Sequence, residues 1–151
     1  MGKTQKLPTS QKHLQLSIYN HQKALPISKR LITRIVKEIL SFLQVDCKEV
    51  SIYFTTIQII SELHEQFFND ATPTDCISFP IDKEHLGEVF ICPAVAIEYA
   101  SKHDIDPLKE TILYMIHGIL HLIGYDDLDP VSKKMMRRME KKCLNHIQFL
   151  L

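Results

Sequence analysis

The segment from Leu108 to Ile123 most limits how this chain can fold. Asp106-Pro107 precedes it, and proline suits the first turn of a helix because that position needs no amide donor. In the second half of the segment, apolar residues occupy nearly every side of such a helix, interrupted by His117 and His121. A helix that is apolar all round must be surrounded by other elements. The pattern therefore predicts a helix in the middle of the molecule.

Patterns on either side of this segment predict short strands mixed with amphipathic helices. Alternation of apolar and polar residues indicates strands, and apolar residues three and four apart indicate helices. We expect strands near residues 14–18, 50–55, 76–79 and 87–92, and helices near 29–43, 57–67, 93–102, 108–123 and from 130 onward. This order predicts an α+β fold with a small central sheet covered by helices, in a single domain over residues 1–151.

The charge of the chain excludes a general attraction to nucleic acid or to anionic membranes. Eighteen basic and eighteen acidic side chains cancel, so any contact with RNA must be local. The four cysteines form no C-x-x-C pair and are expected to be free thiols that act as small buried apolar residues. Residues 1–13 lack the apolar stretch of a signal peptide, and no segment is long enough to cross a bilayer. We expect a cytoplasmic protein.

The sequence H-G-I-L-H-L-I-G-Y-D-D, from His117 to Asp127, carries the chemistry. Two histidines four residues apart lie on one face of a helix, so a single ion can contact both imidazole rings. Gly124 tolerates the left-handed conformation that ends a helix, and the chain can then return Asp126 or Asp127 to the same point. Pairs of histidines also occur by chance in cores. However, an unpartnered imidazole in an apolar segment is costly, which favours a shared metal ion.

Three protein ligands would leave one coordination position for water, which predicts a hydrolase. A catalytic zinc ion lowers the pKa of its water to about 7, so that a hydroxide nucleophile forms near neutral pH. The two histidines and the glycine also match the metzincin protease pattern H-E-x-x-H-x-x-G-x-x-H. Gly118 stands where that pattern has its glutamate base. A metalloprotease is therefore the lowest-ranked of the hypotheses considered.

The same segment resembles the hallmark of the YbeY endoribonucleases, H-G-x-L-H-L-x-G-Y-D-H, and matches it from His117 through Asp126. Upstream, P-T-D-C-I-S-F-P at residues 73–80 is similar to the family's P-T-D-V-L-S-F-P. Residues 86–93, L-G-E-V-F-I-C-P, are similar to its L-G-D-I-x-I-C-P strand. Three motifs in the right order are far more specific than two histidines on a helix. The chain is therefore identified as a member of this family.

The resemblance implies an α+β fold with a mixed sheet and a metal site at the end of the central helix. It also implies a single-strand-specific endoribonuclease that acts in ribosomal RNA maturation and ribosome quality control. Its partners would be ribosomal RNA, the ribosome and a ribosomal protein, with no DNA and no membrane. The role of metal ligand passes to His117 and His121, while Thr74, Asp75 and Ser78 are placed near the cleft, where they could equally be structural.

Two positions depart from the family pattern. The third histidine of the hallmark falls on Asp127, so the implied ligand set is two histidines and one carboxylate, unless Asp126 takes its place. One divalent ion is expected, zinc first, but carboxylate ligation also suits nickel, iron or manganese. The family's upstream arginine aligns with Phe68, which cannot bind a phosphodiester. No catalytic residue is assigned beyond the metal ligands.

The final helix carries a row of basic residues with two interpretations. Lys134, Arg137, Arg138, Lys141 and Lys142 fall on adjoining faces and could contact phosphates, or they could form a solvated face paired with Asp129 and Glu140. The missing arginine leaves a second hypothesis open beside the nuclease. The chain could be a ribosome assembly factor that uses its metal to stabilise the fold and binds RNA without cutting it.

Overall fold

The computed structural model describes residues 13–151, so most of the polar N-terminal segment considered above lies outside the described residues. The element order agrees with the expected order, with ends that differ by a few residues. The elements are β1 (Gln15–Asn20), α1 (Lys29–Phe42), β2 (Glu49–Phe54), α2 (Ile57–Phe68), β3 (Cys76–Pro80), β4 (His85–Ile91), α3 (Pro93–His103), α4 (Pro107–Leu122) and α5 (Pro130–Ile147), followed by a short 3-10 turn. In the described part of the chain, no helix has the length and apolar character needed to span a membrane.

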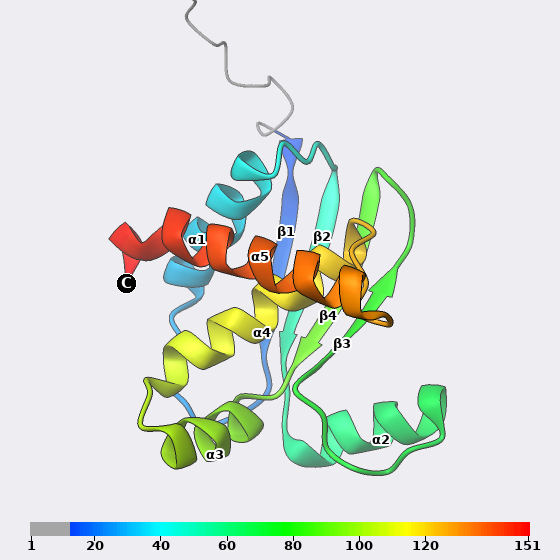
Figure 1. The fold of residues 1–151 in the computed structure, drawn as a ribbon, viewed down its shortest axis with the longest axis vertical. Coiled ribbons are helices and arrows are strands. Elements are labelled where there is room, and N and C mark those ends of the chain that lie inside the picture. The colour runs from blue at the N-terminus through cyan, green and yellow to red at the C-terminus, as the bar shows by residue number, and fades with distance from the viewer. Residues whose placement is uncertain (1–12) are drawn as a thin grey trace, which may run out of the picture.

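The four strands form one mixed sheet in the order β1-β2-β4-β3 (Figure 1). β1, β2 and β4 run parallel, and β3 returns antiparallel to β4. The parallel pair β2 and β4 is separated in sequence by α2 and β3, so these two strands meet through a crossover. The α+β fold with a small mixed sheet is therefore confirmed.

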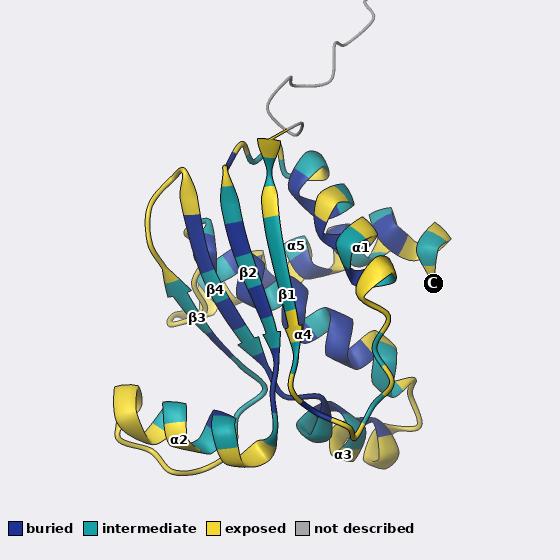
Figure 2. Cartoon of the chain, turned by 180° about the vertical axis from the view of Figure 1, so that it is seen from behind, coloured by how far each residue is buried: buried dark blue, intermediate teal, exposed yellow. Residues whose placement is uncertain are grey.

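One face of the sheet carries the main core. In β2, Val50, Ile52 and Phe54 alternate with less buried residues, as expected where one face packs against helices and the other does not. Figures 1 and 2 show α4 and α5 on the same side of the sheet, while the strands are open to view from the opposite side. On that opposite face, the rings of Tyr19, Tyr53 and Phe90 stack in a row.

The α4 helix lies between the sheet and α5, as its composition predicted. Asp106 caps its first turn by accepting a hydrogen bond from the Leu108 amide, and Pro107 occupies the position that needs no donor. Its isoleucines Ile112, Ile116 and Ile119 are at most 1% exposed. Burial of each such side chain contributes about 1.5–3 kcal/mol. The helix is therefore held firmly on several sides, and it is a rigid base for whatever side chains it carries.

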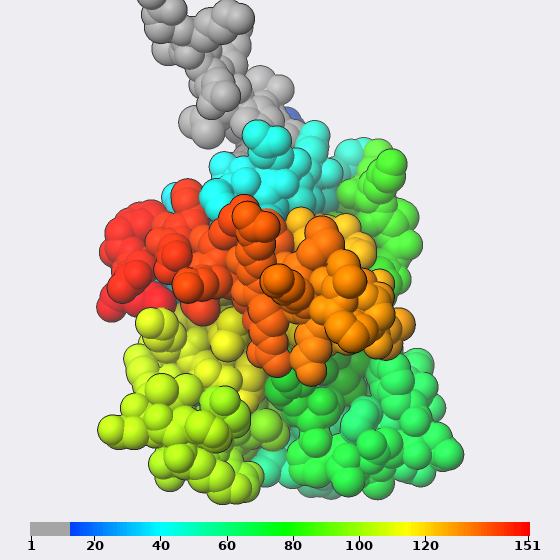
Figure 3. Space-filling view, viewed as in Figure 1, coloured from blue at the N-terminus to red at the C-terminus, as the bar shows by residue number. Residues whose placement is uncertain are grey.

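The α5 helix is amphipathic and crosses the outside of α4 (Figure 3). Its buried positions follow helical spacing and include one charged residue, as the set Met136, Glu140, Cys143 and Ile147 shows. All six of its lysines and arginines are exposed. A buried acidic residue on the apolar side of a helix requires a partner, and that partner lies in the site described next.

Candidate metal centre

Two histidines of α4 project from the same side of the helix into one small space. The Nε2 atoms of His117 and His121 are 2.9 Å apart, and their rings meet edge to face with centroids 4.5 Å apart. Both side chains are partly exposed, at 20% and 29%. The spacing of four residues predicted this juxtaposition, because it places side chains one turn apart on one face.

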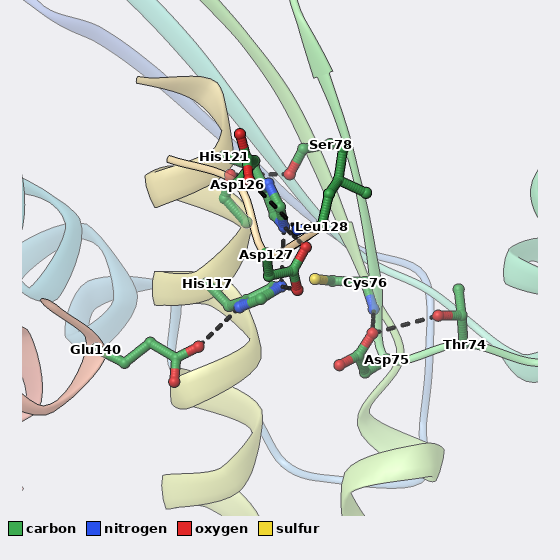
Figure 4. A network of polar contacts seen from close by, with 11 residues as sticks. Thr74, Asp75, Cys76, Ser78, His117, His121, Asp126, Asp127, Leu128 and Glu140 are labelled. Carbon is green, nitrogen blue, oxygen red and sulfur yellow. Dashed lines mark hydrogen bonds and ion pairs between the residues drawn. The ribbon is translucent and has the colours of Figure 1, made fainter. Parts of the chain in front are cut away.

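A left-handed turn brings a carboxylate to the same space. Gly124 has φ of +103°, and the amide of Tyr125 donates to the carbonyl of Leu120, which reverses the chain after α4. As a result, Asp127 places Oδ2 3.6 Å from the Nε2 of His117, and Oδ1 3.7 Å from the Nε2 of His121 (Figure 4). Asp126 instead accepts a hydrogen bond from the Leu128 amide and is not in the donor group.

The donor set fits a divalent cation. One ligand atom from each of His117, His121 and Asp127 lies within 4.8 Å of the others. Tetrahedral ligands at about 2.0–2.1 Å from zinc are separated from one another by about 3.4 Å. The two Nε2 atoms are 2.9 Å apart, and each lies 3.6 or 3.7 Å from one of the two Asp127 oxygens, so these distances lie on either side of that value. Two imidazoles and one carboxylate also leave space for a further ligand.

Glu140 of α5 holds the ring of His117 in this orientation. The Nδ1–H of His117 donates to Glu140 Oε1 at 2.7 Å, and the Glu140 side chain is 8% exposed. With the proton on Nδ1, the lone pair of Nε2 points into the centre. Burial lowers the pKa of His117. However, the hydrogen bond and charge of Glu140, with the charges of Asp75 and Asp127, outweigh burial, so the pKa is raised overall.

The role of Glu140 was missed from sequence, where it was considered as a partner of surface lysines. That interpretation is wrong, because the carboxylate is buried and bonded to His117. A signal was present: Glu140 falls at the helical spacing of the apolar residues Met136, Cys143 and Ile147. An acidic residue on the apolar stripe of a helix indicates a buried polar partner.

Three residues of the P-T-D-C-I-S segment lie beside the centre with different contacts. The hydroxyl of Ser78 donates to the carbonyl of Gly118 at 2.8 Å, and thereby connects β3 to α4. The hydroxyl of Thr74 donates to Asp75 at 3.2 Å, and the same carboxylate oxygen accepts the Cys76 amide at 2.7 Å. Ser78 therefore fixes the position of α4, while Thr74 and Asp75 shape the segment that runs past the histidines.

Two cavities flank the donor group. The first, of about 390 Å³, is lined by His64, Phe68, Thr74, Cys76, Ile77, Ser78, Pro80 and His121. Among the described residues that line it, none is a lysine or arginine, and the Phe68 ring, 58% exposed, lies at its edge. Cys76 is only partly buried here, so the expectation of four buried thiols holds for the other three cysteines, and all four are free.

The second cavity, of about 450 Å³, lies on the side of His117. It is lined by Asp75, Val95, Tyr99, Glu110, Leu113, Tyr114, His117, Asp127, Lys133, Met136, Arg137 and Glu140. Four carboxylates thus face one space, and Lys133 and Arg137 of α5 line the same space. Burial is the main cause that raises the pKa of Glu110, despite a hydrogen bond with Tyr114. A cation in the donor group would offset much of this negative charge.

Comparison with known proteins shows the family to which this chain belongs. The family model described as Endoribonuclease YbeY matches residues 17–148. The Endoribonuclease YbeY of Protochlamydia amoebophila is 47% identical over 137 residues, which cover 87% of this chain and 91% of the relative. The Endoribonuclease YbeY of Chlamydia pneumoniae is 33% identical, with coverage of 89% and 92%. The solution structure of TM1509 from Thermotoga maritima has a TM-score of 0.65 at 26% identity and covers 88% of this chain and 89% of its own. The chain therefore belongs to the YbeY endoribonuclease family.

Proposed function

We propose that this protein is a metal-dependent, single-strand-specific endoribonuclease that acts on ribosomal RNA during its maturation and in ribosome quality control. His117, His121 and Asp127 would hold one divalent ion, zinc first, with nickel, iron or manganese as alternatives. The observation that carries the proposal is the convergence of three donor atoms from these residues within 4.8 Å, in a chain of this family. The proposal places the protein in the cytoplasm, with the ribosome and a ribosomal protein as its partners.

The chemistry of the proposal divides between the ion and the side chains around it. A bound divalent ion would supply Lewis acidity and would lower the pKa of a water molecule, so that hydroxide would be available to attack a phosphodiester. Glu140 Oε1 lies 2.7 Å from Nδ1 of His117 and keeps the ring oriented with its Nε2 toward the donor group. Ser78 holds α4 against β3, so the histidines keep their position relative to Asp127. These residues preorganise the site and leave little to be ordered when the ion binds.

The cavity beside His121 suits an unpaired base. Phe68 exposes its ring at the edge of the cavity, and the His64 ring is 5.7 Å from it. Aromatic rings stack on bases of single strands with little regard to sequence. A duplex offers no free base faces except at its ends, which agrees with a preference for single strands.

The first test combines metal analysis with cleavage. Purified chain is analysed for metal, stripped with chelator, reloaded with each candidate ion, and incubated with single-stranded ribosomal RNA and with the matching duplex. We expect cleavage of the single strand that depends on metal and is lost in His117→Ala and His121→Ala. The matched control is His85→Ala, because His85 is an exposed histidine outside the donor group. Cleavage that survives both substitutions would indicate a contaminating nuclease. A chain that cannot be loaded with stoichiometric metal would contradict the proposal.

Phe68 supports a second candidate function, in which the chain binds RNA during ribosome assembly without cutting it. The cavity at Phe68 has no lysine or arginine among its described lining residues, so it has no permanently charged side chain to pair with a phosphate. Phe68→Arg separates the two functions. The nuclease predicts unchanged or faster cleavage in this variant, and a loss of cleavage would show that the ring itself is needed. An unaltered chain that is loaded with metal and binds RNA but does not cut it would favour the assembly factor.

A metalloprotease is not retained as a candidate. Gly118 occupies the position of the glutamate base in the protease pattern, and it faces the sheet. A Cβ atom there would lie 2.4 Å from Cγ1 of Val89, so a longer side chain has no room. Incubation with casein beside the RNA assay is the simple check, and we expect no proteolysis.

A further inference from the structure

The outer surface of α5 carries six cations and no exposed acidic residue. Its lysines and arginines are all exposed, and its one acidic residue, Glu140, is buried against His117. The set is Lys133, Lys134, Arg137, Arg138, Lys141 and Lys142, here called the α5 basic face. The chain as a whole has a formal charge of zero, so one helix holds a third of its eighteen basic residues. Such a local concentration creates a positive field that the net charge conceals.

The structure removes the alternative in which this face is paired with Asp129 and Glu140. Asp129 accepts hydrogen bonds from the Ser132 amide at 2.9 Å and from its hydroxyl at 2.7 Å, so it caps the helix. Glu140 bonds to His117. Within residues 13–151, no ion pair includes a member of the α5 basic face. The six cations are therefore free to meet an external anion.

The α5 basic face begins at the candidate metal centre. Lys133 and Arg137 line the same 450 Å³ cavity as His117 and Asp127. With Lys141 they form a row at intervals of four residues, which places each cation about 6 Å along the helix from the last. Lys134, Arg138 and Lys142 form a parallel row. In Figure 3, α5 crosses the front of the molecule as a continuous ridge. An extended polyanion could follow this ridge to the donor group.

We propose that the α5 basic face binds the sugar-phosphate backbone of the RNA substrate and leads it to the metal centre. The proposal rests on the proposed function, because it takes RNA as the ligand. The cavity itself contains carboxylates that repel phosphate, so backbone contacts belong to its cationic rim at Lys133 and Arg137. Backbone contacts of this kind position a strand without reading its sequence.

The apolar residues of α5 argue against a membrane as the occupant. A helix that lies on a bilayer needs a continuous apolar face turned to the lipid. In α5 that face is buried, since Met136, Cys143 and Ile147 are at most 1% exposed. Val131 and Met135 are exposed, but they lie in the first turns of the helix, and most of the other exposed residues of α5 are lysines and arginines. A flexible polyanion matches two charged rows better than a lipid surface does.

The test measures RNA binding under conditions that prevent cleavage. The full chain, in excess chelator, is titrated into a fluorescein-labelled single-stranded RNA at several salt concentrations, and anisotropy gives the affinity. The variant Lys133→Gln/Arg137→Gln/Lys141→Gln removes one row. The matched control Arg30→Gln/Arg34→Gln/Lys37→Gln removes the same charge from exposed positions of α1. Single variants Lys133→Gln and Arg137→Gln are measured as well, and thermal melts verify that each variant folds.

The expected result is a change in salt dependence confined to α5. Loss of three phosphate contacts reduces the slope of log affinity against log salt by about 2. If the variant and the unaltered chain bind equally at 1 M salt, the variant therefore binds about 100-fold more weakly at 0.1 M salt. The α1 variant is expected to change the slope much less. Equal affinities for the α5 variant and the unaltered chain would overturn the proposal, as would an equal loss in both variants, which would mean a simple net-charge effect.

Two further outcomes separate this proposal from its alternatives. Vesicles that contain anionic phosphatidylserine serve as the second ligand, and binding of vesicles but not RNA through α5 would overturn the proposal in favour of a membrane. An unaltered chain that binds no RNA would overturn both this proposal and the proposed function. RNA binding that depends on α5, in a metal-loaded chain that does not cut, would support the present proposal and contradict the nuclease.

Discussion

Replacement of Gly118 with alanine tests how closely α4 must approach the sheet. An added Cβ would lie 2.4 Å from Cγ1 of Val89 and 3.1 Å from the hydroxyl of Ser78. The first distance is shorter than real contacts allow, so either the helix or the strand must move. The Ser78 hydrogen bond to the Gly118 carbonyl resists that movement, because it connects the two elements at the same point.

Two opposing effects determine how much Gly118→Ala changes the free energy of unfolding. Alanine is favoured over glycine in a helix interior by about 0.8–1.0 kcal/mol. Overpacking of a close contact costs about 1–3 kcal/mol, and a 2.4 Å contact with a β-branched side chain belongs at the upper end. The difference is a net loss of about 2 kcal/mol in the free energy of unfolding, or a Tm lower by roughly 4–8 °C for a chain of this size. Displacement of α4 would also move His117 and His121 away from Asp127, so metal affinity should fall.

Urea unfolding of the metal-free chain, with metal titration in parallel, measures both effects. The double variant Gly118→Ala/Val89→Ala removes the clashing methyl group. In the Val89→Ala background, we expect Gly118→Ala to be neutral or stabilising by up to about 1 kcal/mol. If Gly118→Ala alone raises the free energy of unfolding, α4 has room for the added carbon, and the argument that Gly118 permits close packing against Val89 is refuted.

Three other outcomes follow from the site and the core. Glu140→Gln should keep the fold but weaken metal binding by about 10- to 100-fold, measured by competition with a chelating dye; unchanged affinity would mean that Glu140 does not orient His117. Gly124→Ala should cost about 1–3 kcal/mol in urea unfolding, purely from its φ of +103°, since nothing lies within 4 Å of the added carbon. Burial and the charge of Glu140 raise the pKa of Cys143 to about 11, so its thiol should react with a disulfide reagent at pH 8 only after unfolding; rapid reaction in the native chain would contradict its burial.

Much of the local structure was predictable because it depends on neighbours in the chain. The central position of α4 followed from its apolar residues, and the shared face of His117 and His121 followed from their spacing of four. The turn at Gly124 was expected from the need for a positive φ, which the structure confirms. The pairing of the two histidines and the turn that follows them were therefore predictable from the sequence.

Other features of the site were not predictable, because they depend on residues far apart in the chain. Glu140 is 23 residues from His117, and Ser78 is 40 residues from Gly118. A sequence pattern that spans one or two helical turns cannot predict contacts between residues so far apart. Glu140 did stand out as an acid among apolar positions of α5, but its partner could not be named until α5 was known to cross α4.

The sequence by itself determined the elements, the two histidines on one helix face and the family, since these depend on backbone periodicity and short motifs. Tertiary structure alone decided the strand order, the approach of the Asp127 carboxylate to the two histidines, and the exposure of six unpaired cations on α5. The physical reason is the range of the interactions. Periodicity acts within a few residues, whereas the direction of a loop and the neutralisation of a charged face depend on the packing of the whole chain.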